Sequence, residues 1–282
     1  MKYAWYAVGL PESTPEEAVR LLKKHGYDGI EWRAVADTGD TANPGFWSGN
    51  RSTLQADWPD SRFKAVADMT RSEGLAMPNL GAYARASQWD LAQRMIDVAA
   101  LMGISSLRIG PAAYPGDGTY QDILQRDQEC YGRVVEYARQ RKVRPLIEIH
   151  MGTIVPSAST ALRYVSRWKP EEIGVIHDAG NMVYEGFENY QMGLEMLGAY
   201  LAHVHVKSAV WVYETAAGPQ RLNWSAVASP LRTGMVNVAA LFKALKSAGY
   251  DKWMALEDFS KVQSQEAKVK DNLAFLKEME SL

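Results

Sequence analysis

The amino-acid sequence predicts one domain over residues 1–282, a (β/α)8 TIM barrel. Short apolar runs typical of buried strands alternate with longer segments of helical periodicity, and eight such units can be counted. Helical segments also end repeatedly in glycine shortly before the next apolar run, as at Gly26, Gly74, Gly103 and Gly249. This repeated helix-to-strand junction favours a parallel sheet closed by regular crossovers.

Each unit begins with a predicted strand that is followed by a loop and a helix. The eight predicted strands are residues 3–8, 29–33, 76–80, 106–110, 145–150, 173–178, 202–207 and 253–258. The first helix should begin near Thr14 and Pro15, because a cap residue, an early proline and the acidic pair behind them suit a helix N-terminus. A doubly wound open sheet is the second choice of fold. A sheet of that kind typically has a glycine-rich, phosphate-binding turn after its first strand, and the sequence has none there.

Composition narrows the classes of function. The 282 residues are 47% hydrophobic and 23% charged, with a net charge of −2, so no basic field would attract nucleic acid or an acidic membrane. No apolar run approaches the roughly 20 residues needed to span a bilayer. Cys130 is the only cysteine, so the chain needs no oxidising compartment. We expect a cytoplasmic protein with a small-molecule partner, and the sequence leaves a homo-oligomer open.

Charged residues interrupt the last four predicted strands. Strands inside a barrel are covered on both faces and should be almost wholly apolar, because an unpaired buried charge is costly. Glu148, Asp178, His205 and Glu257 nevertheless lie at or near the C-terminal ends of these strands. Barrels of this kind build their active sites at that end. The four side chains are therefore predicted to converge on one point.

A bound cation is the simplest explanation for this convergence. Any one of the four residues could instead be a loop cap or half of a salt bridge. Carboxylates that converge without a cation, however, would repel one another strongly at low dielectric. Three carboxylates and an imidazole predict one divalent metal ion, Mn²⁺ or Mg²⁺ first, with Co²⁺ and Zn²⁺ as alternatives.

Motifs along the whole chain resemble those of the xylose-isomerase-like barrels, also called the sugar phosphate isomerase/epimerase superfamily. The motifs are residues 26–31 (GYDGIE), 148–153 (EIHMGT), 178–181 (DAGN), 203–207 (HVHVK) and 256–257 (LE). In the ketose 3-epimerases of that family, the residues matching the four named above are metal ligands. The resemblance thus implies a metal-dependent isomerase or epimerase that acts on a keto-sugar or related polyol.

The resemblance also implies a catalytic pair, Glu148 and Glu257, that transfers protons on opposite faces of the sugar. A proton beside a carbonyl is only weakly acidic, and a metal chelated by the carbonyl and a neighbouring hydroxyl would stabilise the enediolate left behind. A carboxylate can then act as the base. Which glutamate acts first is left open.

Further residues are predicted to bind substrate. They are His150, Asn181, Lys207, Trp32, Arg108 and Trp211. Four of them have a structural alternative: a rim salt bridge for Lys207 and Arg108, a turn former for Asn181, and a structural histidine for His150. Glu31 and Arg33 could likewise bind hydroxyls or form a rim ion pair, and the loop holding Trp47 is a plausible lid. His177 and His203 are expected to pack toward the helices.

Three departures from the family pattern put the reaction in doubt. Many members have a histidine where this chain has Asn181, an aspartate where it has Ser208, and a Gly-Glu-Gly turn where it has residues 232–234 (RTG). The run from His150 to Thr153 resembles inosose dehydratases of the same family. A dehydratase or lyase acting on a keto-inositol or keto-sugar is therefore the alternative reaction.

Two other classes are remote alternatives. An apurinic-site endonuclease shares the fold, but it needs extra histidines for three zinc ions, and Asn181 stands at one of those positions. The net charge of −2 also does not suit DNA. A non-catalytic sugar-binding barrel would have no need of two glutamates at the metal.

Overall fold

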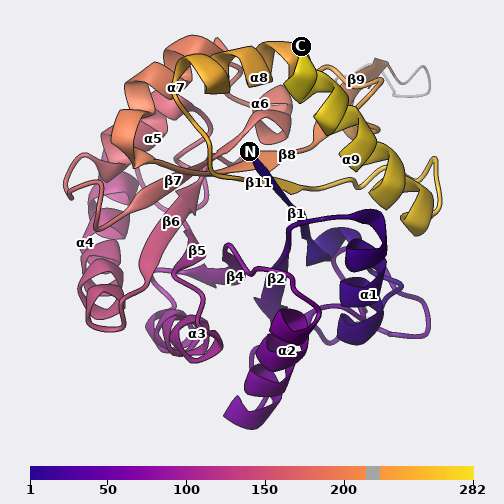
Figure 1. Cartoon of the computed structure of the whole chain (residues 1–282). Helices are drawn as coiled ribbons and strands as arrows, with labels where there is room; N and C mark the ends of the chain where they lie inside the picture. The colour runs from indigo at the N-terminus through magenta and orange to yellow at the C-terminus, as the bar shows by residue number, and fades with distance from the viewer. Residues whose placement is uncertain (214–222) are drawn as a thin grey trace.

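Eight parallel strands close into a barrel in the computed structural model, which describes residues 1–213 and 223–282 (Figure 1). The barrel strands are β1 (Lys2–Tyr6), β2 (Gly29–Val35), β4 (Leu80–Arg85), β5 (Ser106–Gly110), β6 (Arg144–Glu148), β7 (Gly174–Asp178), β8 (Leu201–Val206) and β11 (Trp253–Leu256). β1 pairs with both β2 and β11, which closes the sheet. The predicted barrel is confirmed.

Helices follow the strands and surround the barrel (Figure 1). They are α1 (Pro15–His25), α2 (Asp60–Ser72), α3 (Trp89–Met102), α4 (Tyr120–Gln140), α5 (Ala158–Val165), α6 (Ala179–Tyr184), α7 (Tyr190–Leu197), α8 (Val238–Ser247) and α9 (Gln265–Ser281), with short 3-10 turns at Ala7–Gly9 and Gly198–Tyr200. α1 begins as predicted, because Thr14 and Glu17 form a reciprocal capping box, and it ends at Gly26 with φ of 82°. Among the described residues, no helix is both long enough and apolar enough to cross a membrane.

The third predicted strand is the one misplaced barrel strand. Residues 76–80 were expected, whereas β4 begins at Leu80, and Ala76 makes only an isolated bridge to Gly29. The true strand contains Gly81 and alanines, which have weak strand preference. A side chain at Gly81 would collide with the hydroxyl of Tyr6 on β1, and this close approach explains the glycine.

Three further strands lie outside the barrel pattern and were not predicted. β3 (Leu54–Gln55) pairs with the end of β2, and β9 (Ser208–Tyr213) pairs with β10 (Trp224–Ser229) as an antiparallel hairpin. The hairpin leaves the barrel directly after Lys207. These additions lie on the C-terminal side of β2 and β8, where they can shape a site above the barrel.

Candidate metal centre

The four predicted ligands meet at the C-terminal end of the barrel. Glu148 and Asp178 close β6 and β7, His205 lies in β8, and Glu257 follows β11 directly. One ligand atom from each lies within 4.8 Å of the others, and all four residues are buried. The Nδ1 atom of His205 lies 3.0 Å from Glu148 Oε1 and 3.2 Å from Glu257 Oε1. These side chains form a group that could hold a metal ion.

Two buried cations flank this cluster. Arg108 on β5 forms an ion pair with Glu148, and the ammonium of Lys207 lies 2.5 Å from Asp178 and 2.6 Å from Glu257. Burial alone would raise the pKa of Glu148, but Arg108 and His205 outweigh it and hold that pKa well below its usual range. Lys207 and His205 likewise lower the pKa of Glu257 against the effect of burial. Both glutamates are therefore charged at neutral pH.

Asp178 behaves differently although Lys207 contacts it. Burial, reinforced by the charges of Glu257 and Glu148, outweighs the lysine and raises the pKa of Asp178 to about 7. In this buried site the charge of Asp178 would add to those of Glu257 and Glu148, and the three carboxylates repel one another. A divalent cation would relieve that repulsion.

Asn181 supports the ligands from the first turn of α6. Its backbone N–H donates to Asp178 Oδ1 at 2.9 Å, and its side-chain amide donates to Asp178 Oδ2 at 3.0 Å and to the carbonyl of Ile149 at 3.0 Å. The carbonyl oxygen of the Asn181 side chain is buried and has no hydrogen-bond partner among the described residues. An unpaired acceptor beside the ligands is available to a bound ion, water or substrate hydroxyl.

A second group of buried residues holds His205 from below. Glu31 on β2 lies 3.2 Å from His205 Nε2 and 2.8 Å from His203 Nε2, and it accepts a hydrogen bond from Asn79 at 2.7 Å. A carboxylate that accepts from Nε2 leaves Nδ1 free to face the cluster. The prediction that His203 packs toward the helices is wrong. Residues that are two apart on one strand share a face, so the position of His205 already required His203 to point inward.

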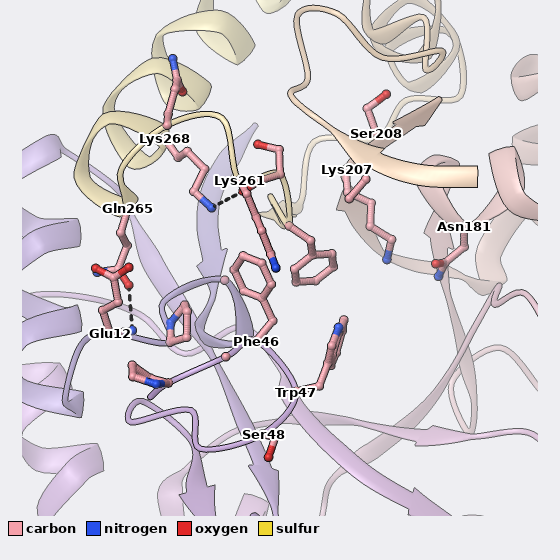
Figure 2. Close-up of a pocket in the computed structure, with 18 of the residues that line it drawn as sticks. Glu12, Phe46, Trp47, Ser48, Asn181, Lys207, Ser208, Lys261, Gln265 and Lys268 are labelled. Carbon is pink, nitrogen blue, oxygen red and sulfur yellow. Dashed lines mark hydrogen bonds between the residues drawn. The ribbon is translucent and has the colours of Figure 1, made fainter. Parts of the chain in front are cut away.

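A cavity of about 1030 Å³ (Figure 2) is lined by Asn181 and Lys207, which contact residues of the cluster. His150, Asn181 and Lys207 line it, as do Trp47 and its neighbours in the predicted lid loop. Arg108 is not among the lining residues and pairs with Glu148 instead. The Nδ1 atom of His150 lies 2.7 Å from the Met151 carbonyl. The structure thus brings His150, Asn181 and Lys207 to the cavity, but not Arg108.

Neither Trp32 nor Trp211 lines this cavity. Trp32 is fully buried, because it alternates with Glu31 and Arg33 and so faces away from the barrel interior. Trp211 lies on β9 and donates a hydrogen bond from its indole to the Val183 carbonyl. The positions of these two indoles outside the cavity do not fit the expectation that they cover a sugar. His177 does face outward, where its ring meets Tyr190 of α7.

The sequence profile of the xylose isomerase-like TIM barrel family matches residues 19–279. The chain belongs to this family. One curated relative of this xylose isomerase-like barrel is an inosose dehydratase of Geobacillus thermodenitrificans, 23% identical over 133 residues. That alignment covers 44% of the chain and 43% of the relative, so it spans less than half of either protein.

Solved structures share the fold over the full length. D-psicose 3-epimerase of Clostridium cellulolyticum H10 has a TM-score of 0.73 at 13% identity, covering 99% of both chains. A zinc-bound IolI protein has a TM-score of 0.74 at 16% identity, covering 100% of this chain and 98% of that one. At these identities the likeness establishes the fold, and the argument for function rests on the site.

The contact between Glu31 and His205 gives a first prediction for this xylose isomerase-like barrel. Glu31→Gln should weaken binding of Mn²⁺ by roughly 10- to 100-fold, the usual loss when the partner of a ligating histidine is removed. Calorimetric titration measures the affinity, and ¹⁵N shifts of the protein with Mg²⁺ bound report which nitrogen of His205 carries the proton. His203→Gln, one contact farther from the ligands, should lose less. Unchanged affinity in Glu31→Gln would remove Glu31 from the metal centre.

The raised pKa of Asp178 predicts how metal binding depends on pH. A cation binds its ionised form, and its pKa is raised to about 7, so affinity should fall as pH decreases below that value. The protonated carboxyl of Asp178 stabilises the metal-free fold at pH values below the ordinary pKa of an aspartate. Because folding raises this pKa, the contribution is lost as pH rises through about 7. Calorimetry at about pH 6 in buffers of different ionisation enthalpy should detect proton release. Equal affinity at about pH 6 and pH 8 would contradict the assignment.

Proposed function

We propose that this chain is a divalent-metal-dependent isomerase or epimerase of keto-sugars or related polyols. The observation that carries the proposal is that Glu148 and Glu257 both lie in one buried cluster beside a large cavity. A sugar-binding module would need neither a buried pair of charged glutamates nor their lysine and arginine partners. These features suit proton transfer at a carbon beside a carbonyl.

The donor set fits a divalent ion, since three carboxylates and one imidazole nitrogen meet within 4.8 Å. Glu148, Asp178, His205 and Glu257 would hold it, with Mn²⁺ or Mg²⁺ favoured. When bound, such an ion supplies positive charge to stabilise oxygens that become negative during reaction. The unpaired oxygen of Asn181 and the ammonium of Lys207 would orient substrate hydroxyls at the cavity floor.

The two glutamates come from separated parts of the barrel. β7 and β8 lie between β6, which ends at Glu148, and β11, which precedes Glu257. The two carboxylates thus approach the cluster from different directions, and one can remove a proton while the other returns it. Arg108 holds the first and Lys207 the second in place. The order in which they act stays open.

A dehydratase acting on a keto-inositol or keto-sugar is the second candidate. The partial match to an inosose dehydratase favours it, as does His150, whose place on the cavity wall would let it contact a departing hydroxyl. Burial lowers the pKa of His150, so this imidazole is neutral at neutral pH. A neutral histidine is better suited to binding a hydroxyl than to protonating it.

One experiment tests both candidates. The Mn²⁺-loaded protein is incubated in D₂O with a panel of ketoses and keto-inositols, and deuterium uptake and loss of water are followed together. Uptake with conversion to an isomer supports the first proposal. Loss of water with little isomer formation supports the second, and neither event with any member of the panel would contradict both.

A further inference from the structure

The cavity extends well beyond the metal centre. Its volume of about 1030 Å³ is slightly above the roughly 300–1,000 Å³ typical of pockets for drug-sized ligands. A single monosaccharide is much smaller than such a ligand. Lys207 and Asn181 line one part of the cavity, and Phe46 and Trp47 line a part across from them (Figure 2). The second part therefore has room for something other than the reacting sugar ring.

An aromatic platform forms this second part, made of Trp47, Phe46 and Phe259. The ring of Phe259 lies 4.8 Å from that of Trp47 and 5.3 Å from that of Phe46, measured between centroids. Trp47 is 54% exposed despite these contacts. An indole held at a cavity wall with half its surface uncovered is suited to stacking on a flat apolar face, such as that of a sugar ring.

Buried polar groups hold the platform in position. The guanidinium of Arg33 donates to the carbonyls of Phe46 and Trp47 at 3.4 and 3.2 Å, and the side-chain amide of Asn50 donates to the Phe46 carbonyl at 3.1 Å. Asp37 accepts backbone hydrogen bonds from the end of the same loop, at 2.9 Å from Gly49 and 3.1 Å from Asn50. Trp47 is thus presented by an anchored loop, and stacking on it costs little ordering entropy.

The platform is continuous with the metal centre. The ammonium of Lys207, which contacts Glu257, lies 5.8 Å from the ring centre of Phe259, and Phe259 contacts Trp47. A sugar ring above Lys207 would therefore have Phe259 at its edge. Trp47 lies one contact farther out, where a group attached to that ring would be placed.

We propose that the platform binds the second ring, or other glycosidic substituent, of an extended substrate, so that this enzyme prefers keto-glycosides to free ketoses. The inference rests on the proposed function. A phosphorylated sugar is less well matched, because the ammonium of Lys268 is occupied by the carbonyls of Asp258 and Ser260 at 3.0 Å each. Among the described residues that line this end of the cavity, exposed Lys261 is the cation that would remain to bind a phosphate.

The test compares four forms of one keto-sugar, either free or with a second glucose, a methyl group or a phosphate attached, using the Mn²⁺-loaded protein in D₂O. The disaccharide should have the highest kcat/KM for deuterium exchange. Trp47→Ala should reduce that value by about tenfold, mainly through KM, and leave the methyl glycoside nearly unchanged. Trp224→Ala is the matched control, since Trp224 is 56% exposed but lies on β10 outside the cavity lining.

A binding measurement keeps this inference separate from the proposed function. Saturation-transfer NMR with Glu257→Gln should show the second ring of the disaccharide against aromatic protons, and the signal should vanish when Trp47→Ala is added. If no keto-sugar exchanges deuterium but this signal is present, the proposed reaction fails and the binding subsite stands. Equal losses for disaccharide and methyl glycoside in Trp47→Ala would overturn the inference. A preference for the phosphorylated form that is lost in Lys261→Ala would also overturn the inference.

Discussion

Glu257→Gln is expected to slow deuterium exchange at the substrate carbon by roughly a hundredfold or more, the usual loss when a general base is removed. Glutamine keeps the size of the side chain and one ligand oxygen but loses the charge of a ligand, so Mn²⁺ should bind more weakly and must be supplied at a saturating concentration. The lost charge removes the ability to take a proton. Exchange measured by NMR at saturating metal and substrate isolates this step from changes in binding.

Asp258 provides the control for Glu257. It is adjacent and points to the other side of the chain, where its carboxylate accepts hydrogen bonds from the Ser260 backbone and the Asn272 side chain at 2.9 Å each. Asp258→Asn removes a charge of the same sign one residue away from the centre. Its effect on exchange should be far milder. Near-normal exchange in Glu257→Gln, or equal damage in the two variants, would rule out the two-glutamate mechanism.

The metal cluster could be predicted from the sequence because its signal is local. Glu148, Asp178 and His205 each interrupt an apolar strand near its C-terminal end, and parallel strands bring those ends together. Strand alternation then places each side chain on the inner face. The structure confirms that the four residues converge, and their roles as ligands and proton carriers stay predictions.

The network around Glu31 was missed because it depends on pairing between distant strands. Glu31 and His203 are 172 residues apart in sequence, and no local pattern indicates that they lie 2.8 Å apart. The inward direction of His203, by contrast, could have been read from its spacing to His205. Trp32 was misjudged for a similar reason, since its position between Glu31 and Arg33 already turned it toward the helices.

The role of Asp178 gives the second large effect. Asp178→Asn should lower Mn²⁺ affinity by more than the roughly hundredfold upper range seen for residues that only support ligands, because it removes the charge of a ligand itself. Asparagine is also a good helix cap, so it can keep the hydrogen bond that Asp178 accepts from the Asn181 backbone at the start of α6. The fold should therefore survive, as a melting curve of the metal-free variant can verify.

Elemental analysis after gel filtration supplies the decisive measurement for this centre. The unchanged protein should carry one divalent ion per chain, and Asp178→Asn should carry almost none and lose deuterium exchange with it. His205→Ala should give the same result, although it also leaves Glu31 buried without one of its partners and should lower the melting temperature. Two or three tightly bound zinc ions would contradict the single centre. Full exchange by either variant after chelation would show that the reaction does not use these residues as metal ligands.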